Sequence, residues 1–400
     1  MGKKRIFISM HYLELGGAEI SLIGLLQALD YSRYDVDLFV YRYQGELMDF
    51  IPKKVNLLQE ITSYACIESP LSEAICRGQV GVAWGRLKAK WRARIYRPKY
   101  PNIPQCAIYQ YIAQETEPYL PTLEQHGEYD LAISFLQPHN YVLSKVRAKK
   151  KACWIHTDYT KVEFDVDAEL PIWSAYDHIV SISPDVTKTF LQVFPSLENK
   201  IFEIENILSP LFVKKRAEEM DVQNEMPKDG TVINVLTVGR FHEQKNLDNV
   251  PDICHRILEN GVNIRWYIIG FGDDSLIQQK IDESRMKDYV IILGKRTNPY
   301  PYMKACDIYA QPSRFEGKSV TVREAQMLCK PVVITDYPTA NSQVQDRLDG
   351  VIVPMDNEGC AKGIVNFIKD KQLQKDIIDY LRSNDYGNEN EVDKIDLLFR

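Results

Sequence analysis

The sequence predicts an α/β protein of two doubly wound, Rossmann-like domains, each built on a parallel sheet. Short, nearly continuous apolar runs alternate with amphipathic helical patterns along the chain, and such runs are typical of parallel strands that are buried on both faces. This alternation is lost once, over residues 211–230. The length of 400 residues also favours two domains, because a single hydrophobic core rarely serves so long a chain.

The first domain is expected to span residues 1–210. The run RIFISM at 5–10 is typical of a strand, and a helical pattern at 18–29 and a second strand pattern at 35–41 follow it. This order makes a β-α-β unit, which implies a parallel sheet. The remaining strands of this half are predicted at 130–136, 151–157, 178–184 and 200–206.

Residues 211–230 are expected to be a linker, and the alternation restarts after them in a second domain at 231–385. Its strands are predicted at 233–239, 264–270, 289–294, 307–312, 331–336 and 350–354. Its helices are predicted at 246–259, 275–285 and 319–328, with two more after the last strand. Residues 386–400 are expected to form a tail or helix that can return to the first domain. Sheets of this kind bind ligands beyond the carboxyl ends of their strands, here in a cleft between the domains.

The composition excludes several classes of protein. A formal net charge of −6 argues against a general nucleic-acid binder. The eight cysteines are scattered, without a C-x-x-C pair, as expected for reduced residues of a cytosolic protein. The apolar run at the N-terminus is too short for a signal peptide, and no segment has the roughly 20 apolar residues that a membrane span needs. We therefore expect a cytoplasmic protein whose membrane contact, if any, is peripheral.

Glycines and cations follow the first strand of each domain. Gly16 and Gly17 precede a helix, whose free N–H groups suit a phosphate or sugar oxygen, although a simple tight turn would have the same sequence. In the second domain Gly239 ends a strand, and Arg240 and Lys245 follow at a spacing that lets both face one anion. Two solvated surface cations are the alternative.

Two glutamates, eight positions apart, follow a later strand of the second domain. Glu316 lies in the loop after the strand, and Glu324 lies on the helix that comes next. The first N–H groups of this helix point back toward the loop, where the helix dipole favours an anion. If Glu324 faces the cleft, its carboxylate can accept hydrogen bonds from a ribose diol. A solvent-exposed Glu324 paired with Arg323 or Lys330 is the alternative. For Glu316, the alternative is a surface loop near Arg314.

These motifs together are similar to the signature of one enzyme family. E-G-x-S-x-x-x-x-E before KPVVITD resembles the E-x7-E motif of retaining GT-B glycosyltransferases, and VGR-x4-K opens the same domain. The chain is similar to the large bacterial group of polysaccharide and lipopolysaccharide transferases, the glycosyl transferases group 1. The resemblance covers most of the chain. The sequence departs from the family pattern at 327–330, where MLCK replaces alanine-cysteine-glycine, and at Lys318.

The resemblance implies a GT-B fold and a role for each motif residue. Arg240 and Lys245, next to Gly239, would bind the diphosphate of a nucleotide sugar. Glu324 would bind the ribose, and Glu316 would contact the donor sugar near the reacting carbon. The other donor-binding groups implied are Gly16, Gly17, Gly294, Lys295, Gly317, Lys318, Ser319 and Val320. The two early glycines would border the diphosphate, the 294–295 loop would lie near the base, and the amides of 317–320 would face sugar and phosphate.

The first domain contributes one more residue to the implied reacting centre. His156 follows a predicted strand and resembles the family's cleft histidine, which contacts the donor sugar or the acceptor. A structural histidine hydrogen-bonded to Asp158 is the alternative. We expect no cofactor and no metal ion, because no D-x-D run follows a plausible strand end. The resemblance implies UDP-sugars as the commonest donors and front-face attack by the acceptor. The two glutamates then hold the donor, instead of acting as a glycosidase acid/base pair.

A basic segment at 76–99 stands out in the first half. It holds eight Lys or Arg and no acid. Its apolar stripe and its basic residues are Trp84, Leu87, Trp91 and Ile95, with Arg86, Lys88, Lys90, Arg92 and Arg94 around them. A basic amphipathic helix with tryptophans suits an anionic membrane surface and, with it, a lipid-linked acceptor. The alternative is that the stripe packs on the first domain and the cations are solvated.

The sequence therefore predicts a retaining, metal-independent transferase that moves a sugar from a nucleotide diphosphate sugar to a saccharide or lipid-linked acceptor in surface polysaccharide assembly. A sugar-nucleotide epimerase or hydrolase of the same fold is an alternative, which would need further acid and base groups in the cleft. A non-catalytic nucleotide-sugar binder is another, against which the lack of an export signal and the reduced cysteines argue.

Overall fold

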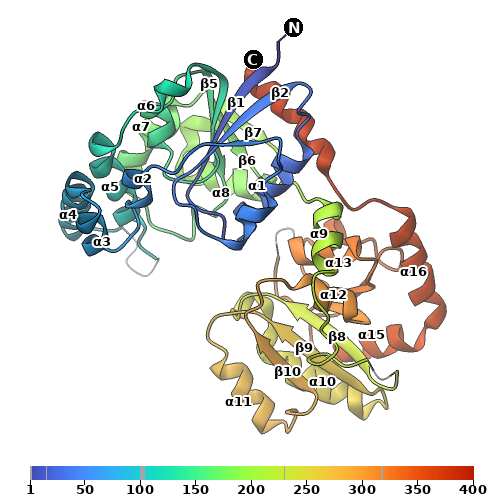
Figure 1. The fold of residues 1–400 in the computed structure, drawn as a ribbon. Helices are drawn as coiled ribbons and strands as arrows, with labels where there is room; N and C mark the ends of the chain where they lie inside the picture. Colours follow the sequence, from blue (N-terminus) through green and yellow to red (C-terminus); the bar gives the residue numbers. More distant parts are fainter. Residues whose placement is uncertain (1, 15, 100–103, 229, 317–318) are drawn as a thin grey trace. The chain divides into compact units, whose positions relative to one another are not determined.

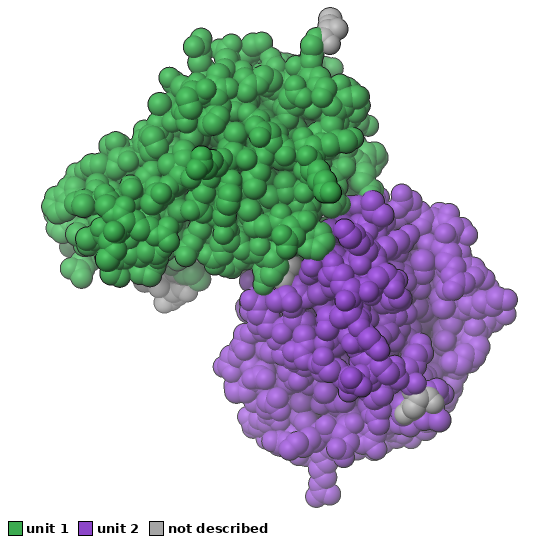
Figure 2. Space-filling model, viewed as in Figure 1, with its two compact units in different colours: residues 1–208, 388–400 green, residues 209–387 purple. Residues whose placement is uncertain are grey.

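The computed structural model describes residues 2–14, 16–99, 104–228, 230–316 and 319–400. The chain divides into two compact units, which Figure 2 shows in separate colours. Unit 1 comprises residues 1–208 and 388–400, and unit 2 comprises residues 209–387. Each unit has its own parallel sheet and its own hydrophobic core, so the fold class predicted from the sequence is confirmed.

Unit 1 is built on a seven-stranded sheet with the order β3-β2-β1-β4-β5-β6-β7 (Figure 1). Its strands are β1 Lys4–Met10, β2 Tyr34–Val40, β3 Asn56–Leu57, β4 Tyr129–Ser134, β5 Ala148–Ile155, β6 His178–Ser181 and β7 Ile201–Glu203. All neighbouring strands are parallel. The strand order reverses between β1 and β4, and this switch point is where doubly wound sheets bind ligands.

Helices surround this sheet, and the core lies where their apolar faces meet it. The helices are α1 Gly17–Ala28, α2 Thr62–Ala65, α3 Leu71–Cys76, α4 Val80–Ile95, α5 Ala107–Thr116, α6 Asn140–Lys145, α7 Val166–Ala175 and α8 Pro184–Val193. Short 3-10 helices are η1 Glu46–Phe50, η2 Glu117–Tyr119, η3 Glu124–His126, η4 Pro195–Lys200 and η7 Glu389–Phe399. Phe7, Phe39 and Trp173 are completely buried in this core.

The C-terminal residues 388–400 belong to unit 1. The side-chain oxygen of Asn388 accepts a hydrogen bond of 2.8 Å from the backbone of Leu208. The Tyr34 hydroxyl donates to Asp396 over 2.5 Å, and the Tyr34 ring stacks on Phe399 with centroids 5.9 Å apart. The end of the chain is therefore bound to the unit that contains its beginning.

Unit 2 repeats the same topology with six strands, in the order β10-β9-β8-β11-β12-β13. The strands are β8 Ile233–Val238, β9 Ile264–Ile269, β10 Val290–Gly294, β11 Ile308–Gln311, β12 Val332–Thr335 and β13 Val351–Val353. The helices are α9 Pro210–Ala217, α10 Val250–Glu259, α11 Ser275–Glu283, α12 Tyr300–Ala305, α13 Val320–Met327, α14 Ala340–Gln343, α15 Asn357–Lys369 and α16 Lys371–Ser383, with 3-10 helices η5 Glu243–Lys245 and η6 Leu247–Asn249. The switch point lies between β8 and β11.

The segment 211–230, expected to be a linker, contains most of α9 and is part of unit 2. Ser209 caps this helix by accepting a hydrogen bond from the backbone of Phe212, and Pro210 occupies its first turn. Both are favoured residues at a helix start, and they lie just before the stretch in which the apolar period fades. Phe212 is buried, with its ring edge-on to Tyr300 at 6.1 Å. Among the described residues, no helix is both long and apolar enough to cross a bilayer.

Candidate functional site

The loops after β8 and β11 meet at the switch point of unit 2. Lys245, in the loop after β8, donates a hydrogen bond of 2.6 Å from its Nζ to Oε1 of Glu316, in the loop after β11. The Lys245 side chain is 17% exposed and that of Glu316 is 6% exposed. Two of the residues predicted from the sequence thus form a largely buried ion pair, more than 70 positions apart in the chain.

The Glu316 carboxylate is fixed by further hydrogen bonds. The Ser313 hydroxyl donates to Oε1 over 2.6 Å, and the Gln244 side-chain amide donates to Oε2 over 3.3 Å. The backbone carbonyl of Glu316 accepts from the Thr339 hydroxyl at 2.7 Å. Both carboxylate oxygens are therefore satisfied by groups from these loops. We call Gly239, Arg240, Lys245, Ser313 and Glu316 the switch-point site.

Glycines allow the strand ends to approach one another closely here. A Cβ on Gly270 would lie 2.0 Å from the carbonyl oxygen of Gly239, so no side chain fits there. A Cβ on Gly239 would press on the Lys245 stem at 3.3 Å. Gly294, at the end of β10, has a φ of 73° and accepts a hydrogen bond of 3.1 Å from Gly270. Next to it, the Lys295 ammonium lies 5.9 Å from the centre of the Phe271 ring.

Glu324 lies inside unit 2. It is 3% exposed, and Oε1 accepts a hydrogen bond of 2.7 Å from the Tyr300 hydroxyl. Burial raises the pKa of Glu324 to about 7. The alternative of an exposed Glu324 paired with Arg323 or Lys330 is wrong, since those side chains donate instead to the carbonyls of Tyr386 and Cys306. Glu324 is buried within unit 2, where α13 packs against α9, β11 and β12 and Tyr300 of α12 reaches its carboxylate; the helical pattern alone did not reveal this.

The remaining predicted donor groups of unit 2 are arranged differently. Arg240 is exposed, and its side chain has no hydrogen-bond or ion-pair partner among the described residues. The amide of Ser319 donates to the Gln343 side chain at 2.6 Å, so this N–H, expected for a ligand, has a protein partner. Val320 begins α13. Gly317 and Lys318 lie outside the described residues.

At the start of α1 in unit 1, a carboxylate lies against the first of the paired glycines. A Cβ on Gly16 would lie 2.2 Å from Oε2 of Glu19, whereas one on Gly17 would meet nothing within 4 Å. Burial raises the pKa of Glu19. The helix start that was expected to face a diphosphate thus lies under an acidic side chain of its own first turn.

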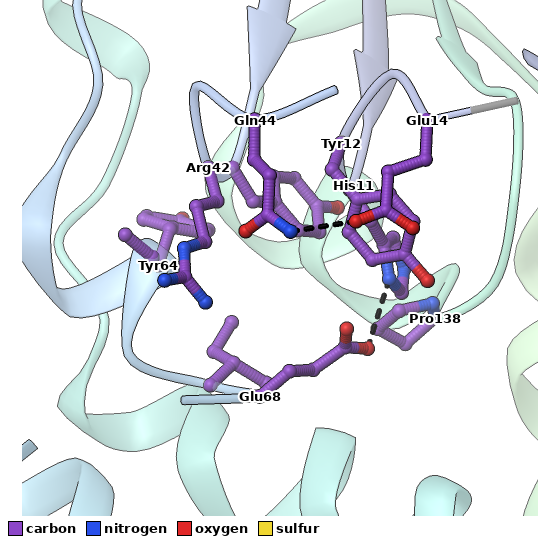
Figure 3. Close-up of a pocket in the computed structure, with 11 residues that line it drawn as sticks. His11, Tyr12, Glu14, Arg42, Gln44, Tyr64, Glu68 and Pro138 are labelled. Atoms are coloured by element: carbon purple, nitrogen blue, oxygen red, sulfur yellow. Dashed lines mark hydrogen bonds and ion pairs between the residues drawn. The ribbon is translucent and has the colours of Figure 1, made fainter. Parts of the chain in front are cut away.

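A polar pocket opens at the carboxyl ends of β1 and β2, with a cavity volume of about 170 Å³ (Figure 3). His11, directly after β1, pairs through Nδ1 with Oε1 of Glu68 at 3.0 Å. Burial opposes ionisation of Glu68, but the hydrogen bond and charge of His11 prevail, so the pKa of this carboxyl lies below its ordinary value. Across the pocket the Gln44 amide donates to Glu14 over 2.6 Å, and the Arg42 side chain also lines the pocket.

Three histidines follow three neighbouring strands of unit 1: His11 after β1, His139 after β4 and His156 after β5. We call them the histidine cluster. Buried ring nitrogens without a hydrogen-bond partner among the described residues are Nε2 of His11, Nε2 of His139 and both nitrogens of His156. Burial lowers the pKa of His156 to about 4. Burial, with the nearby imidazoles of His156 and His11, lowers that of His139 to about 3. Both rings are neutral near pH 7 and can donate and accept hydrogen bonds.

The alternative in which His156 hydrogen-bonds Asp158 is wrong, because Asp158 accepts from the backbone and hydroxyl of Thr160, at 2.9 and 2.6 Å. The sequence analysis missed His11 and His139. His11 carries the signal that pointed to His156, a polar ring directly beyond a buried strand, whereas His139 lies further along, at the start of α6. Among the described residues, no group of three or more His, Cys, Asp or Glu is arranged to hold a metal ion.

Comparison with known proteins places unit 2 in a family. The model of glycosyl transferases group 1 matches residues 218–384. Residues 218–384 are therefore a glycosyl transferases group 1 domain. The match lies entirely within unit 2 and includes both halves of the Lys245–Glu316 pair.

A curated relative and solved structures extend the likeness. Over 145 residues the chain is 31% identical to the N-acetylgalactosamine-N,N'-diacetylbacillosaminyl-diphospho-undecaprenol 4-alpha-N-acetylgalactosaminyltransferase of Campylobacter jejuni; this covers 35% of the chain and 39% of the relative. TarM of S. aureus matches 100% of the chain and 99% of its own, with 13% identity and a TM-score of 0.65. HepE of Anabaena, solved in complex with UDP, matches 98% of each chain, with 15% identity and a TM-score of 0.60. The chain therefore has the GT-B fold class of two Rossmann-like units.

Proposed function

We propose that this chain is a retaining glycosyltransferase that moves a sugar from a nucleotide diphosphate sugar to a saccharide or lipid-linked acceptor in surface polysaccharide biosynthesis. The observation that carries the proposal is the buried Lys245–Glu316 pair at the switch point of unit 2, inside the region that matches glycosyl transferases group 1. A cation and a fixed carboxylate side by side suit a ligand with phosphate at one end and sugar hydroxyls at the other.

The cations of the switch-point site account for the leaving group. Cleavage of the anomeric C–O bond leaves negative charge on the departing diphosphate. Lys245 has three N–H donors and uses one on Glu316, so two remain for phosphate oxygens. Arg240 is exposed and adds a planar fork. Because preorganised cations stabilise developing charge strongly in a water-poor site, we propose that the transfer needs no metal ion.

Glu324 supports the proposal through the nucleoside. Its carboxylate is anchored on one oxygen by the Tyr300 hydroxyl, which leaves acceptor capacity for a ribose diol. The exposed Phe271 ring, beside Lys295 in the loops after β9 and β10, offers an aromatic face near the position proposed for the base. We propose UDP as the nucleotide, in line with the UDP complex of HepE.

For the acceptor, we propose the polar pocket and the histidine cluster of unit 1. The neutral imidazoles of His139 and His156 bind hydroxyl groups without a net charge, which suits a saccharide. A histidine with a pKa of about 4 is a weak general base near pH 7, so His156 would position a hydroxyl. In the front-face route the acceptor hydroxyl passes its proton to a phosphate oxygen, and no protein base is required.

The nature of the acceptor also bears on where the protein works. The Campylobacter relative acts on a saccharide linked to diphospho-undecaprenol, as its name states. We propose an acceptor of the same class for this chain, and a cytoplasmic location at the inner face of the plasma membrane.

Nucleotide binding tests this function first. We expect UDP to raise the melting temperature of the full chain by several degrees in the presence of EDTA, since ligand at about 100 times its Kd adds about 2.7 kcal/mol to the free energy of unfolding. No shift with UDP, GDP or other nucleoside diphosphates would contradict a nucleotide-sugar site, and a shift only with added Mn²⁺ or Mg²⁺ would contradict metal independence.

Product analysis then separates transfer from other reactions of the same fold. A panel of nucleotide sugars is incubated with a lipid-linked saccharide extract and analysed by mass spectrometry. We expect release of the nucleoside diphosphate only with acceptor, together with a product heavier by one sugar whose anomeric configuration matches the donor. Nucleotide release without acceptor would indicate a hydrolase or an epimerase, and an inverted anomer would contradict retention.

A further inference from the structure

Helix α4 exposes a row of apolar side chains at the periphery of unit 1, where it lies against α3 and α5 (Figure 1). Each member of the row is between 48% and 65% exposed. The members are Val80, Trp84, Leu87, Trp91 and Ile95. At about 100° per residue they fall within an arc of about 80°. We call them the apolar stripe.

The opposite side of α4 is the packed side, and it consists of small residues. A Cβ on Gly85 would lie 2.3 Å from the carbonyl oxygen of Glu115, so the two helix backbones approach closely there. Val82, Ala83 and Ala89 are also buried. The possibility that the apolar stripe packs on the first domain is therefore wrong. The stripe points away from the only side on which the described residues cover the helix.

The basic residues around the stripe divide into two sets. Arg86 donates to the backbone carbonyls of Cys66 and Ser69, and Arg92 pairs with Glu115 at 2.8 Å. The second set has no ion-pair partner among the described residues and is exposed. It consists of Lys88, Lys90 and Arg94. By the helical period, Lys88 flanks the stripe on one side, and the other two flank it on the opposite side.

The charge around the apolar stripe indicates what kind of partner would bind it. Segment 76–99 holds eight Lys or Arg and no acid, whereas the whole chain has a net charge of −6, so the rest of the protein is acidic. A second copy docking stripe to stripe would bring like charges together. Tryptophans flanked by free cations fit instead the boundary between acyl chains and anionic headgroups.

We propose that the apolar stripe is a docking surface for an anionic lipid bilayer, with Trp84 and Trp91 at the level of the headgroups and Lys88, Lys90 and Arg94 on lipid phosphates. This goes beyond the proposed reaction, since it depends on neither the donor nor the acceptor. It does give the chain a fixed contact with the surface that would present a lipid-linked substrate.

Tryptophan fluorescence of the full chain tests the insertion directly. The other three tryptophans, Trp154, Trp173 and Trp266, are buried, so a change on adding vesicles reports on Trp84 and Trp91. We expect a blue shift, and quenching by brominated acyl chains, with mixed phosphatidylglycerol and phosphatidylcholine vesicles. Phosphatidylcholine alone should give little of either. No spectral change and no co-sedimentation with the anionic vesicles would overturn the proposal.

Two variants separate the apolar and the electrostatic parts. In co-sedimentation, Trp84→Ala/Trp91→Ala should weaken vesicle binding by about tenfold or more. Lys88→Glu/Lys90→Glu/Arg94→Glu should weaken it by about a hundredfold, given about 1 kcal/mol per basic residue near an anionic surface. Vesicle binding at the wild-type level in both variants would exclude the stripe as the docking surface.

A matched control reverses three exposed lysines elsewhere. Lys362→Glu/Lys371→Glu/Lys375→Glu on α15 and α16 changes the net charge by the same amount and should leave vesicle binding within about twofold. Equal loss in this control would mean that total charge, and not the stripe, drives binding. UDP-dependent melting shifts should persist in every variant, which keeps this test distinct from that of the reaction. Self-association by sedimentation velocity that disappears in the tryptophan variant would point to a second copy as occupant and overturn the proposal.

Discussion

Both units carry polar side chains at the carboxyl edge of a parallel sheet, but the hydrogen bonding of these side chains differs between the units. In unit 2 the Lys245–Glu316 pair is charged and its carboxylate accepts several hydrogen bonds. In unit 1 the buried imidazole nitrogens of His156 have no partner among the described residues, and burial keeps the ring neutral at pH 7. A site with an assembled ion pair suits a charged ligand, whereas neutral rings with unused donors and acceptors suit hydroxyl groups.

The family match follows the same division. It covers residues in unit 2 and none in unit 1. The contrast between the switch-point site and the histidine cluster can be tested by variants that act on one and spare the other.

Removal of the Lys245 ammonium should have the largest effect. Lys245→Ala leaves Glu316 without its cation and the leaving group without a fixed charge, so we expect kcat to fall by about a thousandfold. Steady-state kinetics with a saturating donor measures this. Lys280→Ala is the control, because Lys280 also forms a partly buried ion pair in unit 2, with Asp248 at 2.9 Å. Comparable losses in both variants would show that Lys245 acts only through stability.

Glu324→Gln should weaken UDP binding by about tenfold to a hundredfold, the range for a lost hydrogen bond to a charged group. Since the pKa of Glu324 is about 7, wild-type affinity should rise as pH increases through 7, and this rise should be absent in the variant. Calorimetric titration with UDP from pH 6 to about 8 checks both points. Glu169→Gln is the control, as burial also raises the pKa of Glu169, in unit 1, to about 7.

The raised pKa values of Glu324 and Glu169 also lead us to expect a pH dependence of the free energy of unfolding. The pKa of each carboxyl is higher in the folded chain than its ordinary value of 4.5, so the folded chain holds a proton that the unfolded chain releases at a lower pH. The stabilisation from this proton is complete below about pH 4.5 and is lost as pH rises toward 7. Each Gln variant should flatten the fall in melting temperature over this range. A melting temperature that rises from pH 5 to about 7 in the wild type but not in the variants would contradict the assignment.

His156→Asn should have a smaller effect, confined to the acceptor. Loss of one neutral hydrogen-bonding ring costs about a factor of ten in kcat/KM for the acceptor, with UDP affinity unchanged. Because the pKa of His156 is about 4, acceptor kcat/KM should show no histidine titration between pH 5 and about 8. A wild-type inflection near pH 6.5 that the variant lacks would mean that His156 titrates as a general base.

The smallest change is expected for Arg240→Lys. Arg240 is exposed and holds no protein partner among the described residues, so Lys keeps the charge and loses only the bidentate fork. We expect kcat/KM for the donor to fall by about three- to tenfold. Arg323→Lys, on the outer face of α13 and bonded to the Tyr386 carbonyl, serves as control and should leave donor kinetics unchanged. A larger loss for Arg240→Lys than for Lys245→Ala would reverse the proposed order of the two cations.

Some residues of the candidate site could be predicted from the sequence, and others could not. Lys245 and Glu316 were predicted to share a site, because each follows a recognisable strand and parallel strands end at one edge of a sheet. His11 and His139 belong to no motif, and α9 starts at a Ser-Pro pair just before the apolar pattern fades. The burial of Glu324 escaped prediction because it depends on Tyr300 in another helix, not on the period of its own.

The sequence by itself determined the alternation of strands and helices, the edge at which polar residues gather and the family that residues 218–384 resemble, because these follow from short-range periodicity and local motifs. Tertiary structure alone decided which side of α4 is packed, since the close approach at Gly85 turns Trp84 and Trp91 outward. It also decided the pKa of Glu324 and of His156, because desolvation is set by neighbours that are distant in the chain.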